Sequence, residues 1–457
     1  MRALLLILLA MTLGQDSPAA TAASPPPPSF DPRIRDIVDS ISAERIEADI
    51  RKLAGFGTRH TMSETESDTR GIGAARRWIQ AEFERISEDC GGCLEVSSQA
   101  TLVEADGRRI KRDTRVVNVI AILRGTNDPN RYVIMSGDID SRASDALDDT
   151  SAAPGANDNA SGMAGTIEAA RSLSKYRFPA SIVFAGLSGE EQGLFGGQHM
   201  AQMARREGWI IEGVLNNDMI ANVEGIDGIT ANDTFRVFSE PTPVTETEEA
   251  RRRRRFTGGE VDGPSRQLAR YVARVSELYV SNLDAIMIYR LDRFGRGGHH
   301  RPFNDEGFPA VRIMETHENY NRQHQDIRVE DGVEYGDVIE GCDFGYAAKL
   351  TAVNAATLAA LASAPAPPRD VLVGGAVRPS TTLSWDPVAS PQMAGYKVYW
   401  RDTTAPQWVK SRYVGNVTEF TLENIIIDNY LFGVASVAKD GNESPVVFPS
   451  GTIEGRR

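Results

Sequence analysis

Residues 131–140 read RYVIMSGDID, and this stretch decides the fold because an apolar, β-branched run leads directly into carboxylates. The segments ASIVFA at 180–185 and GVL at 213–215 have the same apolar character. Turn formers or charges bound each of these runs, as is usual for buried strands. Between them, residues 161–173 and 191–205 are predicted helices. This alternation predicts an α/β domain with a mainly parallel central sheet flanked by helices.

Length and composition agree with a large folded protein. The chain has 457 residues, which is enough for two or three domains. With 41% hydrophobic and 25% charged residues, it can bury a core and is not a disordered chain. The net charge of −13 excludes a general nucleic-acid binder, because no positive field covers the surface.

The N-terminus has the features of a signal peptide. Arg2 precedes an apolar run at 4–13, which is too short to cross a bilayer, since a spanning helix needs about 20 residues. The segment Ala20-Thr21-Ala22 fits the small-residue cleavage pattern. We therefore predict a signal peptide at 1–22 and an exported protein, periplasmic or secreted. No later apolar run is long enough to predict a transmembrane segment.

Export would place the cysteines in an oxidising setting. The segment CGGC at 90–93 then predicts a small structural disulfide between Cys90 and Cys93. Cys342 has no obvious partner, and we expect a buried free thiol there.

The C-terminal part has a different pattern. A Pro/Ala-rich linker at 362–368 separates it from the α/β domain. Period-two strands separated by turns then predict a sandwich. The segments LSW at 383–385, YKVY at 396–399, YLFGV at 430–434 and GNES at 441–444 resemble the fibronectin type III family. We expect a metal-binding domain at 23–364 and a small all-β fibronectin type III sandwich at 365–450.

Acidic side chains follow each predicted strand of the α/β domain, and another lies in the loop PGANDNASG at 154–162. Strand ends of a parallel sheet meet at one edge, so these groups should converge. Gathered like charges repel unless cations bind between them. Carboxylates with one imidazole suit divalent metals. The candidate residues are Asp138, Asp140, Asp158, Glu190, Glu191, Asp218 and His324.

The same segments, in this order, resemble the secreted bacterial zinc aminopeptidase family. These di-zinc exopeptidases include leucyl aminopeptidases, glutamate carboxypeptidase-like proteins and glutaminyl cyclases. The resemblance covers about residues 40–362 and implies a zinc exopeptidase-like fold with Zn²⁺ as cofactor. Its matching segments are GDIDSR at 137–142, PGANDNASG at 154–162, EEQGL at 190–194, NDM at 217–219, residues 298–310, and His324.

The resemblance also implies a role for each candidate residue. Asp158 would bridge two metals, with Glu191 and His324 completing the first site. Asp138 and Asp218 would complete the second site. Glu190 would be the general base, and Asp140 corresponds to the aspartate that orients a ligand.

The sequence departs from the family at Asp138, where the usual pattern is His-x-Asp. No imidazole therefore stands at 138 for Asp140 to orient. The second site, formed by Asp138, Asp158 and Asp218, would be all-carboxylate. An oxygen-only site favours zinc less and admits manganese, magnesium or calcium more easily, so we expect the second metal to be held more weakly.

Other residues are candidates for the substrate pocket. His300 follows the Gly-rich loop at 295–298 and could line it, and Arg142 could meet a substrate carboxylate. We prefer His324 over His317 as the metal ligand. An insertion at about 222–296 contains the arginine run 251–255, for which a solvated loop is expected.

The combined reading is an exported metallo-aminopeptidase that hydrolyses N-terminal peptide bonds, with Glu190 as general base for the attacking water. Its partner would be a peptide substrate. A glutaminyl cyclase-like acyltransferase is one alternative, although Gln323 stands where family cyclases carry tryptophan. A carboxypeptidase-like enzyme and a non-catalytic binding module are the others.

Overall fold

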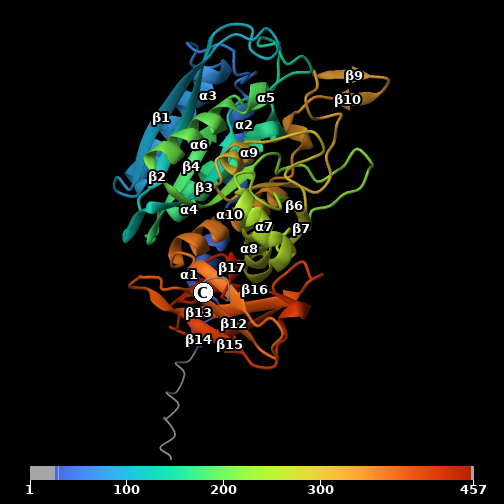
Figure 1. Cartoon of the computed structure of the whole chain (residues 1–457). Helices are drawn as coiled ribbons and strands as arrows, with labels where there is room; N and C mark the ends of the chain where they lie inside the picture. Colours follow the sequence, from blue (N-terminus) through green and yellow to red (C-terminus); the bar gives the residue numbers. More distant parts are fainter. Residues whose placement is uncertain (1–25, 29, 454–457) are drawn as a thin grey trace, which may run out of the picture.

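A single eight-stranded sheet forms the centre of the α/β unit in the computed structural model (Figure 1). Its strands are β1 (Leu94–Val103), β2 (Thr114–Leu123), β3 (Asp128–Asp138), β4 (Ala180–Leu187), β5 (Ile210–Asn217), β6 (Thr234–Phe238), β7 (Asp284–Ile288) and β8 (Ala310–Glu315). The strand order is β1-β2-β4-β3-β5-β8-β6-β7, and β4, β3, β5 and β8 run parallel. The structure describes residues 26–28 and 30–453, so the predicted signal peptide lies outside it.

Helices cover both faces of this sheet. One apolar core includes residues of α2, α3, α4, α8 and α10, and a second core lies under α6 and α9. Since both faces are covered, every residue of β4 is buried, which explains its uninterrupted apolar sequence. In the described part of the chain, no helix has the length and apolar character needed to cross a membrane. The helices are α1 (Pro32–Asp39), α2 (Ala43–Ala54), α3 (Gly71–Asp89), η1 (Ala156–Ser161), α4 (Gly162–Leu173), α5 (Glu190–Gly193), α6 (Phe195–Glu207), α7 (Glu248–Thr257), α8 (Pro264–Tyr279), α9 (His300–Asp305), η2 (Ile339–Gly341) and α10 (Phe344–Ser363).

The predicted strands lie within β3, β4 and β5, but the predicted helix at 191–205 is interrupted. The short helix α5 ends at Gly193, and α6 begins at Phe195. Leu194 between them has a φ of 65°, a left-handed conformation that ends the first helix. This break lets α5 take its own direction at the end of β4.

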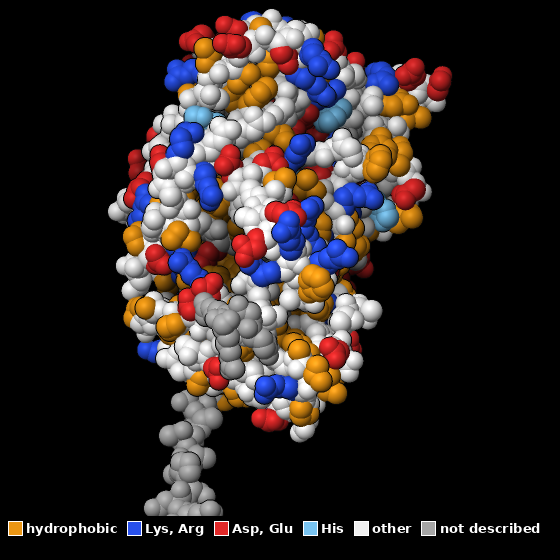
Figure 2. Space-filling model, viewed as in Figure 1, with side chains coloured by type: hydrophobic (Ala, Val, Ile, Leu, Met, Phe, Trp, Pro, Cys, Tyr) orange, Lys and Arg blue, Asp and Glu red, His pale blue; other side chains and the backbone are white. Residues whose placement is uncertain are grey.

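The insertion at 222–296 contributes β6 and β7 to the edge of the sheet, together with α7 and α8. The expected loop at the arginine run is wrong, because these residues form the helix α7 (Figure 1). Figure 2 shows basic side chains gathered on the surface over this helix. Thr247 caps this helix by accepting a hydrogen bond from the N–H of Ala250. Acidic residues in the first turn and arginines in the last turn also suit the helix dipole.

The C-terminal part is an all-β unit of two sheets that enclose their own apolar core. α10 ends at Ser363 and β11 begins at Arg369, so the predicted linker overlaps the connection between them. The sheets have the orders β15-β12-β11-β17 and β14-β13-β16. The strands are β11 (Arg369–Gly374), β12 (Thr381–Asp386), β13 (Met393–Asp402), β14 (Lys410–Gly415), β15 (Glu419–Leu422), β16 (Tyr430–Ala438) and β17 (Gly451–Thr452), with η3 (Ile427–Asn429) before β16.

Buried ion pairs join this unit to α8, at the end of the molecule away from α5 (Figure 1). Glu443, only 4% exposed, lies 2.8 Å from Arg274 of α8 and 2.9 Å from Lys397 of β13. Asp262 in turn lies 2.8 Å from Arg401 of β13. Although burial opposes its ionisation, Arg274 and Lys397 lower the pKa of Glu443 to about 2.

We expect the variant Glu443→Gln to unfold more easily at pH 7, by about 2–4 kcal/mol. The folded-state pKa of Glu443 lies below its ordinary value of 4.5, so its contribution is complete above that pH and is lost as the pH falls from 4.5 toward 2. Urea unfolding between pH 7 and pH 3 would measure this change. The matched control is Glu419→Gln, at an exposed position of the same unit. A difference between Glu443→Gln and wild type that stays constant with pH would contradict the assignment.

Candidate metal centre

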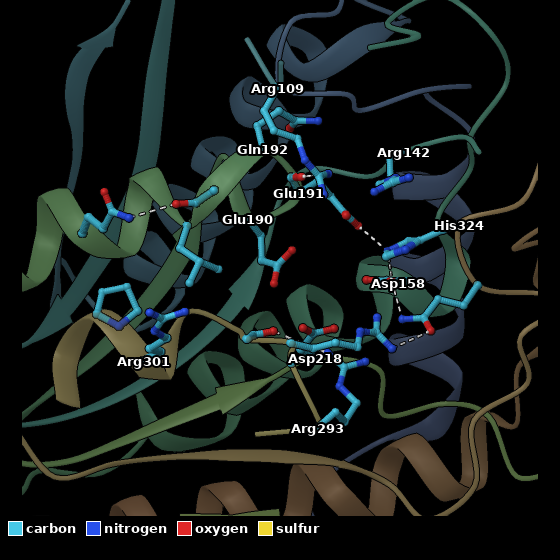
Figure 3. Close-up of a pocket in the computed structure, with 18 of the residues that line it drawn as sticks. Arg109, Arg142, Asp158, Glu190, Glu191, Gln192, Asp218, Arg293, Arg301 and His324 are labelled. Atoms are coloured by element: carbon cyan, nitrogen blue, oxygen red, sulfur yellow. Dashed lines mark hydrogen bonds and ion pairs between the residues drawn. The ribbon is translucent and has the colours of Figure 1, made fainter. Parts of the chain in front are cut away.

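A pocket of about 460 Å³ opens at the carboxyl edge of the central sheet (Figure 3). β3 lies between β4 and β5, the next two strands of the chain. The connection after β3 therefore leads to one side of it, and the connection after β4 leads back past it to the other side. Ligand sites of open α/β sheets form at such a point. Asp158, Glu190, Glu191, Asp218 and His324 all line the pocket.

Asp158, Glu191 and His324 form a compact group, in which one possible ligand atom of each lies within 4.8 Å of the others. The Nε2 atom of His324 is 3.1 Å from Oδ2 of Asp158 and 3.1 Å from Oε1 of Glu191. Burial opposes protonation of His324, but the two carboxylates outweigh it and raise its pKa to about 10. The site therefore attracts positive charge, and one imidazole with two carboxylates is a donor set that fits zinc.

The loop that carries Asp158 is held by a carboxylate that the sequence reasoning missed. Asp337, which follows the hairpin of β9 (Arg328–Glu330) and β10 (Val333–Tyr335), accepts hydrogen bonds from the N–H groups of Asn157 at 2.8 Å and Asp158 at 2.6 Å. Gln323 also donates to Oδ2 of Asp158 at 3.1 Å. No sequence signal pointed to Asp337, because it lies far along the chain in an irregular segment.

Asp140 holds the backbone of the glutamate pair. Its carboxylate accepts hydrogen bonds from the N–H groups of Glu190 at 3.2 Å and Glu191 at 3.1 Å, and from the hydroxyl of Thr61 at 2.9 Å. These bonds satisfy the first N–H groups of α5, which the helix itself leaves unpaired. Asp140 is 1% exposed and is not among the pocket-lining residues, so it acts by positioning α5.

Glu190 points into the pocket between Glu191 and Asp218 (Figure 3). Among the residues that the structure describes, no side chain or backbone N–H donates a hydrogen bond to its carboxylate. Burial, together with the neighbouring carboxylates of Asp218 and Glu191, raises the pKa of Glu190 well above its usual range. An unpaired carboxylate with a raised pKa is suited to accepting and returning a proton.

The expected all-carboxylate second site is not formed. Asp138 lies 2.5 Å from Nδ1 of His299 and accepts a hydrogen bond from the side-chain amide of Asn159 at 2.6 Å. His299, from the segment before α9, thus supplies an imidazole beside Asp138, a contact that the sequence did not predict. Asp218 is paired with Arg312 of β8 at 2.6 Å. Among the described residues, Asp158, Glu191 and His324 are the one group of at least three possible ligands whose atoms lie within 4.8 Å of one another.

The two candidates for the substrate pocket differ in position. His300 does not line it, because its ring is fully buried at the start of α9 with Nε2 2.8 Å from the carbonyl of Leu291. The prediction for His300 is therefore wrong. Arg142 does line the pocket. Four further arginines of the pocket were missed, because single arginines carry no distinctive sequence pattern; they are Arg109, Arg293, Arg296 and Arg301, of which Figure 3 labels all but Arg296.

A comparison with known proteins finds a matching family model and several relatives. A family model described as peptidase family M28 matches residues 118–332. A probable zinc metalloprotease of Leptosphaeria maculans is 44% identical over 423 residues, covering 92% of this chain and 98% of the relative. Another from Pyrenophora teres is 42% identical over 428 residues, covering 93% and 88%. These relatives are fungal, so they do not support the bacterial origin that the resemblance implied.

Among solved structures, the LapA aminopeptidase of Legionella pneumophila superposes with a TM-score of 0.53 at 18% identity, covering 75% of this chain and 78% of that one. This likeness shows the shared α/β fold. The name of the fungal relatives specifies zinc, and the donors Asp158, Glu191 and His324 fit that ion. The chain belongs to peptidase family M28, and its cofactor is zinc.

Proposed function

We propose that the protein is an exported zinc aminopeptidase that hydrolyses the peptide bond at the N-terminus of its substrate. The observation that carries this proposal is the position of Glu190, whose free carboxylate enters the pocket beside Asp158, Glu191 and His324. A general base next to a metal-binding group is the arrangement that metal-assisted hydrolysis requires.

In this proposal Asp158, Glu191 and His324 hold the ion. Bound zinc supplies a Lewis acid that polarises the scissile carbonyl and lowers the pKa of a coordinated water. Glu190 accepts the proton of the attacking water and returns it to the leaving amine. Burial and the neighbouring carboxylates raise the pKa of Glu190, which suits a group that acts first as a base and then as an acid.

The adjacent glutamates divide these tasks because Asp140 fixes the backbone of both. Glu191 reaches toward His324, with 3.1 Å between the facing atoms, whereas Glu190 faces the open pocket. Asp140 is thus a positioning residue in this proposal.

The size of the pocket supports action at a chain end. A cavity of about 460 Å³ has the dimensions of a site for a small ligand or a few residues. Export rests on the sequence of residues 1–22, and the disulfide between Cys90 and Cys93 suits an oxidising compartment. We also propose that the unit at 365–450 is a fibronectin type III domain, which its two-sheet arrangement supports.

A carboxypeptidase-like enzyme is the second candidate, and the arginines of the pocket favour it. Arg142 donates hydrogen bonds to the carbonyls of Ala143 and Ser144, and Arg109 donates to the carbonyl of Glu191. Within the described residues, neither guanidinium has a carboxylate partner. Either could meet the free carboxylate of a peptide.

We expect Glu190→Gln to bind zinc normally and to lose hydrolytic activity by about 10²–10⁴-fold, because the amide cannot take a proton. Turnover of aminoacyl anilides and bound zinc would be measured on the same preparations. Glu334→Gln, at an exposed position of β10, is the matched control and should keep full activity. An active Glu190→Gln enzyme would show that another group is the base.

We expect His324→Ala to lose bound zinc, whereas His317→Ala keeps it. His317 lies outside the metal-binding group, 3.6 Å from Asp227. Zinc at about 100 times its dissociation constant should stabilise the folded protein by about 2.7 kcal/mol, and this gain should vanish in His324→Ala. Metal analysis and denaturant unfolding with and without zinc measure both effects. Equal zinc binding by the two variants would contradict the ligand assignment.

We expect the wild-type enzyme to hydrolyse peptides with a free N-terminus and to leave N-acetylated peptides intact. A panel of aminoacyl anilides and N-acetyl dipeptides with free carboxylates measures this preference. Cleavage of the N-acetyl dipeptides instead, with a rise in KM in Arg142→Gln, would establish the carboxypeptidase-like alternative.

A further inference from the structure

We propose that the guanidinium of Arg312 takes the place of the second metal ion, so that each chain binds one zinc. This inference rests on Asp158, Glu191 and His324 as the ligands of that zinc, and it replaces the two-metal arrangement that the sequence resemblance implied. It starts from the two carboxylates expected at the second site, Asp138 and Asp218.

Arg312 neutralises Asp218 directly. It lies on β8 with no exposed surface, and its Nη2 atom is 2.6 Å from Oδ2 of Asp218. Its Nη1 atom donates to the carbonyl of Gly297 at 2.8 Å and lies 3.2 Å from Oδ2 of Asp292. Three oxygens from two segments, the end of β5 and the stretch between β7 and α9, therefore fix the guanidinium beside the carboxylate that would have served a metal.

Arg312 keeps its charge under all conditions in which the protein is folded, because a guanidinium does not deprotonate in proteins. The pKa of Arg312 is raised still further, since the carboxylates of Asp218 and Asp292 outweigh the effect of burial. A second divalent ion at Asp218 would lie close to this fixed positive charge and would be repelled by it.

Asp138 is also committed to other partners. His299 lies 2.5 Å from one of its oxygens, and the amide of Asn159 donates to the other at 2.6 Å. Several buried side-chain atoms in this region have no partner among the described residues, and they include Oδ1 of Asp218, Nε2 of His299 and Nε of Arg312. With Asp138 occupied, the free atoms of Asp218 and His299 do not make a second group of ligands comparable to Asp158, Glu191 and His324.

Metal stoichiometry tests the inference without relying on activity. The purified full chain would be loaded with excess Zn²⁺, passed through a desalting column and analysed by mass spectrometry. We expect about one zinc per chain in the wild type. A parallel titration with Co²⁺, followed by visible absorbance, should saturate at one equivalent.

The variant Asp218→Asn distinguishes the one-zinc arrangement from the two-zinc arrangement. If Arg312 occupies the second position, Asp218→Asn keeps one zinc, because Asp218 is not a ligand of that ion. Glu191→Ala is the matched variant and should bind none. Two zinc ions in the wild type, falling to one in Asp218→Asn, would overturn the inference and leave the proposed hydrolase intact.

Asp218→Asn removes one of the two carboxylates that pair with the buried Arg312, so this variant could fail to fold. The wild-type measurement stands in that case. An absence of tightly bound zinc in the wild type would overturn both the inference and the ligand assignment on which it rests. That outcome is distinct from the two-zinc result, so the two failures can be told apart.

Discussion

Repulsion between carboxylates at the edge of β3, β4 and β5 is the constraint on which the rest of this structure depends. The strand ends and the loop at 154–162 bring Asp138, Asp158, Glu190, Glu191 and Asp218 together, and all of them except Glu190 are buried. Charges of one sign in a region shielded from water destabilise the fold unless each is compensated. The surrounding segments can be understood as the sources of that compensation.

Four of these five carboxylates have a compensating partner. Asp218 has the guanidinium of Arg312, and Asp138 has the imidazole of His299 and a side-chain amide. Asp158 and Glu191 face His324. Glu190 alone has no donor among the described residues, and its pKa rises accordingly. The group left uncompensated is the one that faces the open pocket, which is where a proton acceptor is useful.

The sequence was sufficient to predict much of this arrangement. The apolar runs located β3, β4 and β5, and the acids that follow them located the pocket edge. The interruption at Leu194 was missed, because a residue other than glycine with a positive φ leaves no clear mark in an apolar sequence. The break matters, since it gives α5 the orientation that Asp140 stabilises.

The groups that compensate Asp218 and Asp138 were harder to predict for a physical reason. Arg312 lies in the middle of β8, between apolar residues that give the strand its pattern, and His299 is 161 residues from Asp138 along the chain. Pairings of this kind are determined by the sheet order and not by local sequence. The acidic residues alone therefore predicted a second metal site, whereas in the structure the guanidinium of Arg312 supplies positive charge from the chain itself.

Because the chain itself supplies partners for two of the carboxylates, these two do not need a metal ion to be stable in the fold. Arg312 and His299 are covalently part of the chain, so their pairing with Asp218 and Asp138 does not depend on the metal supply. Among the residues that the structure describes, the group of Asp158, Glu191 and His324 is the one arranged so that an exchangeable cation could bind. The floor of the pocket is thus stabilised permanently, while zinc is confined to the position next to Glu190, where its charge can act on a substrate.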